Sequence, residues 1–206
     1  MRLGMTDEER RNAILDDRET IYELLYQRAF KKGKFTLASG RASDFYLDCK
    51  KALTIDGLYA IGDLFVDAIY ERFRSELREF AGVGGLTMGA DPLAVATCMR
   101  AWARGFTNLH PFYVRKEPKK HGTEQWIEGP AFEEGTRVII VEDVITTGGS
   151  ALKAIQRVRI HQLNPVMVVA LVDRCEDNGR QTLEAEGIPV YALFNRKDFF
   201  PDEGSR

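Results

Sequence analysis

Two uninterrupted apolar runs, "VIIV" at 138–141 and "VMVVALV" at 166–172, constrain the fold of this chain more than any other feature. Strands that are apolar on both faces are typical of parallel sheets covered by helices on both sides. From residue 81 onward, short apolar segments alternate with helical patterns of ten or more residues. Such alternation indicates parallel strands joined by right-handed crossovers. The sequence therefore predicts an α/β fold with a central parallel sheet and helices on both faces.

The N-terminal residues lack this alternation. A capping box formed by Thr6 and Glu9 begins a helical pattern, and Gly33 is expected to end that helix. Residues 35–53 mix turn residues with aromatic ones, which predicts short strands around a loop. We expect a single domain over residues 1–206, with a small hood at about 1–55 and a core at about 56–195. Trp102 lies in a helical segment of that core and is expected to be buried.

Composition narrows the functional classes. At 206 residues the chain can bury a full core, and a net charge of −2 gives no support for a nucleic-acid or membrane partner. There is no apolar run of membrane-spanning length and no signal-peptide pattern near residue 1. Cys49, Cys98 and Cys175 form no CxxC pair, and we interpret them as reduced, mostly buried thiols of a cytoplasmic protein.

The stretch "EDVITTGGS" at 142–150 joins the first apolar run to a helical pattern. In open α/β sheets, ligands bind beyond the carboxyl ends of the strands. Free amides of the first helical turn, the positive end of the helix dipole and three hydroxyl groups would surround one small volume, which suits a phosphate monoester. A nucleotide-triphosphate loop would need a lysine after the glycines, and a dinucleotide site would need GxGxxG; neither pattern is present.

Glu142 and Asp143 directly precede this phosphate cradle. Carboxylates there would repel a phosphate, so we expect them to accept hydrogen bonds from vicinal sugar hydroxyls instead. Either acid alone would more often cap the following helix. Together with the cradle, the pair fits a ribose 5-phosphate.

The stretch "VIIVEDVITTGGS" resembles the phosphoribosyl-diphosphate signature of the type I phosphoribosyltransferases. Within that class, "FTLASGRASDFYLD", "GGLTMGADPLA", "VRKEPKKHG" and "VDRCED" are similar, in order and spacing, to segments of the orotate phosphoribosyltransferase family. The resemblance runs from about residue 20 to residue 195. It implies the type I phosphoribosyltransferase fold and transfer of a phosphoribosyl group to orotate, giving orotidine 5′-monophosphate and diphosphate in UMP biosynthesis.

The resemblance also implies a role for each matching residue. Glu142 and Asp143 would bind the ribose hydroxyls, Thr146 would touch orotate, and Arg174 would pair with the orotate carboxylate. The residues implied in catalysis are Lys119, His121 and Asp143. The residues implied in binding phosphoribosyl diphosphate are Arg115, Lys116, Lys119, His121, Glu142, Asp143, Val144, Ile145, Thr146, Thr147, Gly148, Gly149 and Ser150.

Residues 115–135 would form a mobile catalytic loop, since proline and glycine bracket a polar segment that packs poorly. In the family some loop residues come from the neighbouring subunit, which implies a homodimer with a shared active site. Mg²⁺ would be carried by the diphosphate, without a direct protein ligand, and would neutralise part of the charge on the leaving group.

The chain departs from the family at Ala38, at Met88 and Gly89, and at Glu142, which replaces the commoner Asp, and two alternatives remain open. Many relatives have a lysine where Ala38 stands, and some have Tyr-Lys where Met88 and Gly89 stand. Lys50 and Lys51 could add anion contacts, although surface charges are common. The first alternative is a phosphoribosyltransferase for another base. The second is a non-catalytic regulator that senses phosphoribosyl diphosphate, although no basic recognition helix is evident.

Overall fold

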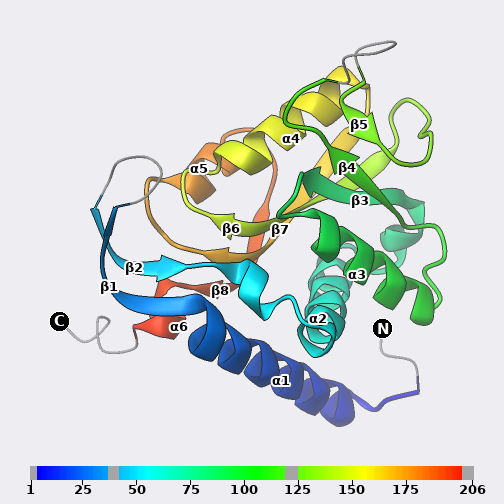
Figure 1. Cartoon of the computed structure of the whole chain (residues 1–206). Helices are drawn as coiled ribbons and strands as arrows, with labels where there is room; N and C mark the ends of the chain where they lie inside the picture. Colours follow the sequence, from blue (N-terminus) through cyan, green and yellow to red (C-terminus); the bar gives the residue numbers. More distant parts are fainter. Residues whose placement is uncertain (1–3, 37–41, 119–124, 201–206) are drawn as a thin grey trace.

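The computed structural model describes residues 4–36, 42–118 and 125–200. A six-stranded sheet in the order β5-β4-β3-β6-β7-β8 forms its centre (Figure 1). Neighbouring strands pair in parallel, except that β5 pairs antiparallel to β4. The predicted α/β class is therefore confirmed, with one short antiparallel strand added at the edge. The strands are β3 (Phe80–Leu86), β4 (His110–Val114), β5 (Ile127–Glu128), β6 (Arg137–Ile145), β7 (Asn164–Asp173) and β8 (Val190–Asn195).

Helices cover both faces of the sheet (Figure 1). In β6, Ile139 and Val141 pack on the side of α1, α2 and α3, whereas Val138 and Ile140 pack on the side of α4 and α5. Successive side chains of a strand point to opposite faces, so a fully apolar strand needs two apolar layers. The helices are α1 (Asp7–Leu24), α2 (Ile55–Phe73), α3 (Asp91–Ala103), α4 (Gly149–Ile160), α5 (Gly179–Glu184) and α6 (Arg196–Phe199), with shorter turns η2 (Cys49–Ala52) and η3 (Arg74–Glu79).

The N-terminal part packs beside the sheet as α1 and an antiparallel hairpin of β1 (Phe30–Thr36) and β2 (Ala42–Leu47). The capping box of Thr6 and Glu9 is confirmed. The expected helix end at Gly33 is wrong: α1 passes into a π-helix, η1 (Leu25–Ala29), and Gly33 lies inside β1 at a shift in strand register. The helix stops earlier because Phe30 turns extended and stacks against Phe199 at a centroid distance of 5.3 Å.

Burial follows the predicted pattern with exceptions. Trp102 was expected in the core but is 64% exposed, because α3 packs on the sheet through Leu93 and Ala94 and turns Trp102 to the opposite side. Cys49 and Cys98 are buried free thiols, whereas the free thiol of Cys175 is exposed. None of the described helices combines the length and apolar character needed to span a bilayer.

A buried ion-pair cluster joins α2 to α3. Asp63 pairs with Arg104 and, at 2.9 Å, with Arg100, and Arg104 also pairs with Asp67 at 2.8 Å. The Asp63 and Arg104 side chains are only 4% exposed. Because both charges have left water, each depends on the other for compensation.

Asp63→Ala is expected to lower the free energy of unfolding by about 3 kcal/mol, because the substitution leaves a buried guanidinium short of its partner. Urea unfolding of the variant and the wild type would measure this difference. Glu71→Ala is the control: its ion pair with Arg74 is exposed, and its loss should cost less than about 1 kcal/mol. Equal small losses in both variants would contradict a stabilising cluster.

Candidate active site

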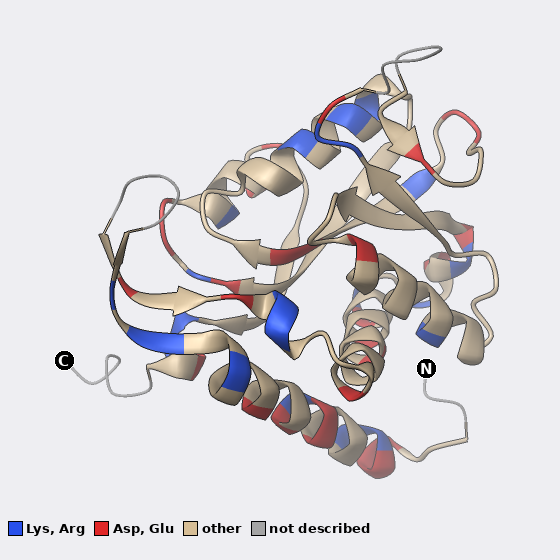
Figure 2. Cartoon of the chain, in the orientation of Figure 1, with Lys and Arg blue, Asp and Glu red and all other residues tan. Residues whose placement is uncertain are grey.

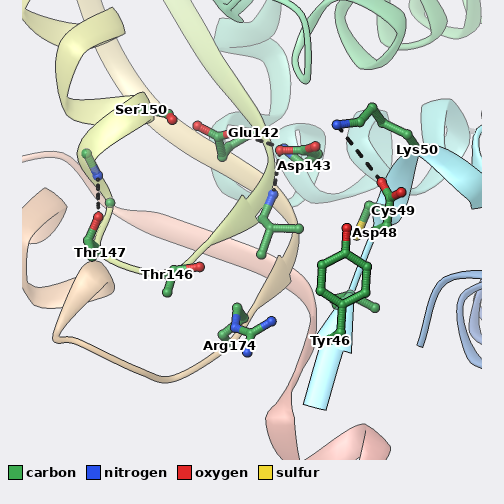
Figure 3. A pocket seen from close by; sticks show the side chains of 14 residues that line it. Tyr46, Asp48, Cys49, Lys50, Glu142, Asp143, Thr146, Thr147, Ser150 and Arg174 are labelled. Atoms are coloured by element: carbon green, nitrogen blue, oxygen red, sulfur yellow. Dashed lines mark hydrogen bonds and ion pairs between the residues drawn. The ribbon is translucent and has the colours of Figure 1, made fainter. Parts of the chain in front are cut away.

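A cavity of about 400 Å³ opens at the carboxyl ends of β6 and β7, where the N-terminal part meets the sheet. Figure 3 shows its side chains converging from β6, from the turn before α4, from the end of β7 and from η2. This is the edge of the sheet where an α/β fold binds its ligands. The lining residues are Tyr46, Leu47, Asp48, Cys49, Lys50, Glu142, Asp143, Val144, Thr146, Thr147, Gly148, Gly149, Ser150 and Arg174.

Residues 146–148 form the turn between β6 and α4, and Gly149 and Ser150 begin the helix. Gly148 is the N-cap of α4 with φ +75°, and a Cβ there would lie 2.7 Å from the carbonyl oxygen of Gly179. The hydroxyl of Thr147 accepts a hydrogen bond of 3.3 Å from the amide of Gly149. The first turn of α4 thus presents backbone amides beside several hydroxyl groups, as the predicted phosphate cradle requires.

Glu142 and Asp143 stand at the end of β6, beside the cradle (Figure 3). Glu142 is 5% exposed, and its Oε2 is buried with no hydrogen-bond partner among the described residues. Oδ1 of Asp143 accepts a hydrogen bond of 2.9 Å from the amide of Val144. The helix-capping alternative is wrong for both acids, because α4 has no side-chain cap. The pair therefore offers free acceptor oxygens to a ligand.

Burial raises the pKa of Glu142 well above its ordinary value, and the hydrogen bond and charge of Asp143 raise it further. The positive charge of Lys116 acts in the opposite direction, which brings this predicted site residue into the surroundings of the two acids. A carboxyl group that is costly to ionise and lacks a donor is prepared to accept a hydrogen bond from a ligand.

Glu142→Gln is expected to stabilise the ligand-free protein at about pH 8, since glutamine keeps the neutral form that burial favours. The folded-state pKa of Glu142 lies above 4.5, so wild-type stability falls as pH rises from 4.5 through the folded-state pKa. The gain in Tm should vanish below pH 4.5 and grow above it, by about 2–4 °C for each kcal/mol. Thermal unfolding across this pH range measures the effect; Glu133→Gln, an exposed control, should show no such gain.

Arg174 follows β7 and is held firmly from the N-terminal part. Its Nε donates to Glu176 at 2.9 Å, its Nη2 donates to the hydroxyl of Ser43 at 2.9 Å, and its guanidinium lies 3.9 Å from the ring centroid of Phe45. Nη1 has no hydrogen-bond partner among the residues that the structure describes. A buried and oriented guanidinium with one free donor group suits recognition of a carboxylate.

The two aromatic residues of β2 separate in role. Phe45 is a core residue under Arg174, whereas Tyr46 is 41% exposed and lines the cavity. Trp126 stacks with the guanidinium of Arg157 at 3.3 Å, which accounts for an aromatic residue within the segment 115–135.

Two of the other predicted site residues, Arg115 and Ile145, do not line the cavity. Arg115 follows β4, where its amide donates to the carbonyl of Trp126 at 2.9 Å and its side chain pairs with Glu128 at 3.2 Å. Ile145 is fully buried in the sheet. Lys119 and His121 lie outside the described residues. The roles of all these residues stay predictions.

The sequence suggested anion contacts from Lys50 and Lys51, but it did not indicate that Asp48 and Cys49 would line the cavity as well. Asp48, Cys49 and Lys50 line the cavity opposite the cradle, and Figure 2 shows the basic segment of η2 beside the acidic end of β6. The only signal in the sequence was the charge of Lys50 and Lys51, which gave no indication of which one faces the cavity.

Comparison with known proteins places this geometry in a class. The crystal structure of a phosphoribosyltransferase from Corynebacterium diphtheriae has a TM-score of 0.73 at 31% identity and covers 89% of this chain and 98% of its own. The Mycobacterium tuberculosis orotate phosphoribosyltransferase, solved with phosphoribosyl diphosphate, has a TM-score of 0.67 at 32% identity and covers 88% and 98%. Fold and site together define a type I phosphoribosyltransferase.

The sequence relatives are more specific. The orotate phosphoribosyltransferase of Sorangium cellulosum is 43% identical over 188 residues, which is 90% of this chain and 94% of that protein. The chain belongs to the orotate phosphoribosyltransferase family. The Aquifex aeolicus member is 42% identical over 186 residues, 88% of this chain and 96% of its own. No protein-family model matches the chain.

Proposed function

We propose that this protein transfers the 5-phosphoribosyl group of phosphoribosyl diphosphate to orotate, giving orotidine 5′-monophosphate and diphosphate for UMP biosynthesis. One observation carries the proposal: an anion cradle, a pair of carboxylates and an oriented guanidinium line the same cavity. These groups match the phosphate, the sugar hydroxyls and the acidic base in chemistry. The complex of the M. tuberculosis relative with phosphoribosyl diphosphate supports the same substrate here.

In this proposal the substrate lies across the cavity in a defined direction. The 5-phosphate occupies the turn at 146–150, and the ribose hydroxyls donate to Glu142 and Asp143. Orotate lies between Thr146 and Arg174, with its carboxylate on the free Nη1 and with Tyr46 nearby (Figure 3). Each polar end of the substrate thereby meets a group of complementary charge or hydrogen-bonding capacity.

Displacing diphosphate from the anomeric carbon develops positive charge on the sugar and negative charge on the leaving group. We assign Lys119 and His121 to the diphosphate, where cationic donors stabilise charge that grows in the transition state. Asp143 and Glu142 hold the ribose while the anomeric carbon changes partner. Arg174 and Thr146 keep the orotate ring oriented toward that carbon.

Mg²⁺ fits this cavity in its chemistry. The carboxylates of Asp48, Glu142 and Asp143 are hard oxygen ligands of the kind that Mg²⁺ prefers. Within the described part of the chain, no group of three or more His, Cys, Asp or Glu residues could hold a metal ion alone. We propose that diphosphate oxygens would carry the ion, which would neutralise part of the charge of the leaving group.

We propose that residues 115–135 include the loop that closes over the bound substrates. The backbone hydrogen bond from Arg115 to Trp126 and the pairing of β4 with β5 fix the base of this segment. A loop on a fixed base can close over the cavity and exclude water, which otherwise hydrolyses the activated sugar.

We also propose a homodimer that uses an apolar surface on α2 and α3, hereafter the α2–α3 patch. Its side chains are between 55% and 86% exposed and comprise Ile55, Tyr59, Met99 and Trp102. Large contiguous apolar surfaces mark interfaces. We choose a second copy as the occupant because Tyr113 lines the groove of about 560 Å³ in this patch. Tyr113 directly precedes the strand end from which the segment 115–135 begins. A partner subunit bound there would lie beside the loop that we propose to contribute to the active site of the neighbouring subunit.

The deciding experiment follows consumption of orotate with and without phosphoribosyl diphosphate and Mg²⁺, alongside hypoxanthine and adenine. We expect orotate, but neither hypoxanthine nor adenine, to be consumed, and only when both phosphoribosyl diphosphate and Mg²⁺ are present. Turnover of a purine would favour a phosphoribosyltransferase for another base. Binding of phosphoribosyl diphosphate without turnover of any base would favour a regulator.

The free thiols of Cys49, Cys98 and Cys175 support a cytoplasmic location.

A further inference from the structure

Lys50 occupies the wall of the cavity opposite the phosphate cradle (Figure 3). Its amine points toward Asp143, and its Nζ lies 4.0 Å from Oδ1 of Asp48. The side chain is 65% exposed, so the amine is open to a ligand that enters the cavity. Lys51, the next residue, is exposed and does not line the cavity.

The charge of the cavity favours a cation at this place. Phosphoribosyl diphosphate is strongly anionic, whereas Asp48, Glu142 and Asp143 already contribute carboxylates to the wall. In the described part of the wall, the basic side chains are Arg174 and Lys50. Arg174 is committed to Glu176 at 2.9 Å, whereas the contact of Lys50 with Asp48 is at the outer limit of an ion pair. Lys50 therefore remains available to neutralise substrate charge.

The neighbouring loop offers no substitute. Gly89 stands where some relatives have lysine, and a Cβ at Gly89 would lie 2.8 Å from the carboxylate of Asp143. A side chain at position 89 would displace the acid that the ribose needs. Gly89 itself therefore places no side chain beside Asp143.

The direction of the substrate points its diphosphate toward Lys50. With the 5-phosphate in the cradle and the hydroxyls on Glu142 and Asp143, the anomeric carbon lies on the far side of the ribose from the cradle. We propose, on the basis of the function proposed above, that Lys50 binds the diphosphate of phosphoribosyl diphosphate. Asp48 lies beside the amine, at 4.0 Å, in the ligand-free protein.

The test compares Lys50→Ala with Lys51→Ala, a matched control one residue away. Lys50→Ala should raise the KM and the Kd for phosphoribosyl diphosphate roughly 10- to 100-fold, the effect of losing a hydrogen bond to a charged group. Its affinity for ribose 5-phosphate, which lacks the diphosphate, should equal that of the wild type. Lys50→Arg should recover most of the affinity, and Lys51→Ala should change neither Kd by more than about twofold.

Two results would overturn the assignment: an unchanged Kd for phosphoribosyl diphosphate in Lys50→Ala, or an equal loss for ribose 5-phosphate. Failure of the proposed function would look different, because the wild-type protein itself would then not convert orotate. Thermal unfolding of Lys50→Ala should match the wild type, since the side chain is 65% exposed.

Discussion

Gly148→Ala should lower kcat/KM for phosphoribosyl diphosphate by about 10²-fold or more, the effect of moving a reacting group by about 1 Å. The added Cβ would lie 2.7 Å from the carbonyl oxygen of Gly179, and φ at this position is +75°. The turn must therefore shift, and the amides that define the cradle shift with it. Steady-state kinetics with saturating orotate would measure the loss.

Backbone strain alone could also inactivate the protein, and Gly187 separates the two effects. Its φ is +78°, but a Cβ there meets no atom within 4 Å, and it lies away from the cavity. Gly187→Ala should therefore lose stability by about 1–2 kcal/mol, as any left-handed alanine does, while keeping its activity. Gly148→Ala with activity within about threefold of the wild type would show that the cradle does not position the phosphate.

The fold was predictable because its main determinants are local in sequence. The apolar run 138–141 needs an apolar layer on each face of the sheet, whatever the rest of the chain does. The residues that follow each strand repeat a helical spacing. The end of α1 was not predictable, because it depends on Phe30 packing against Phe199 from the other end of the chain. Strand β5 spans only Ile127–Glu128 and forms only because it pairs with β4. Two residues are too few to show an alternating pattern of apolar residues in the sequence.

The residues of the site likewise divide into those that could be predicted from the sequence and those that could not. The cradle and its acids are contiguous in sequence, so their chemistry could be inferred without the fold. The setting of Arg174 could not, because Ser43 and Phe45 reach it from β2 and Glu176 from the turn beyond β7. Lys50 and Lys51 look alike as adjacent charges, and only the winding of η2 turns Lys50 toward the cavity. Positions that depend on contact between distant segments need the structure.

A mixture of two impaired variants should regain about a quarter of wild-type activity if the active site is shared across a two-fold dimer. Lys119→Ala should lower kcat by about 10²–10³-fold, and far more than it weakens sugar binding, because its contact strengthens in the transition state. Gly148→Ala has an intact loop but a damaged cradle. Co-expression gives mixed dimers in which the intact loop of one chain meets the intact cradle of the other.

The expected recovery follows from counting sites. Random pairing makes about half of the dimers mixed, and each mixed dimer holds one site with both parts intact. If the loop acted only on its own chain, every site would carry a defect, and the mixture would be no more active than its components. Met99→Glu on both chains, placing a charge in the α2–α3 patch, should abolish the recovery by separating the subunits. Recovery that survives this charge would show that the subunits meet through another surface.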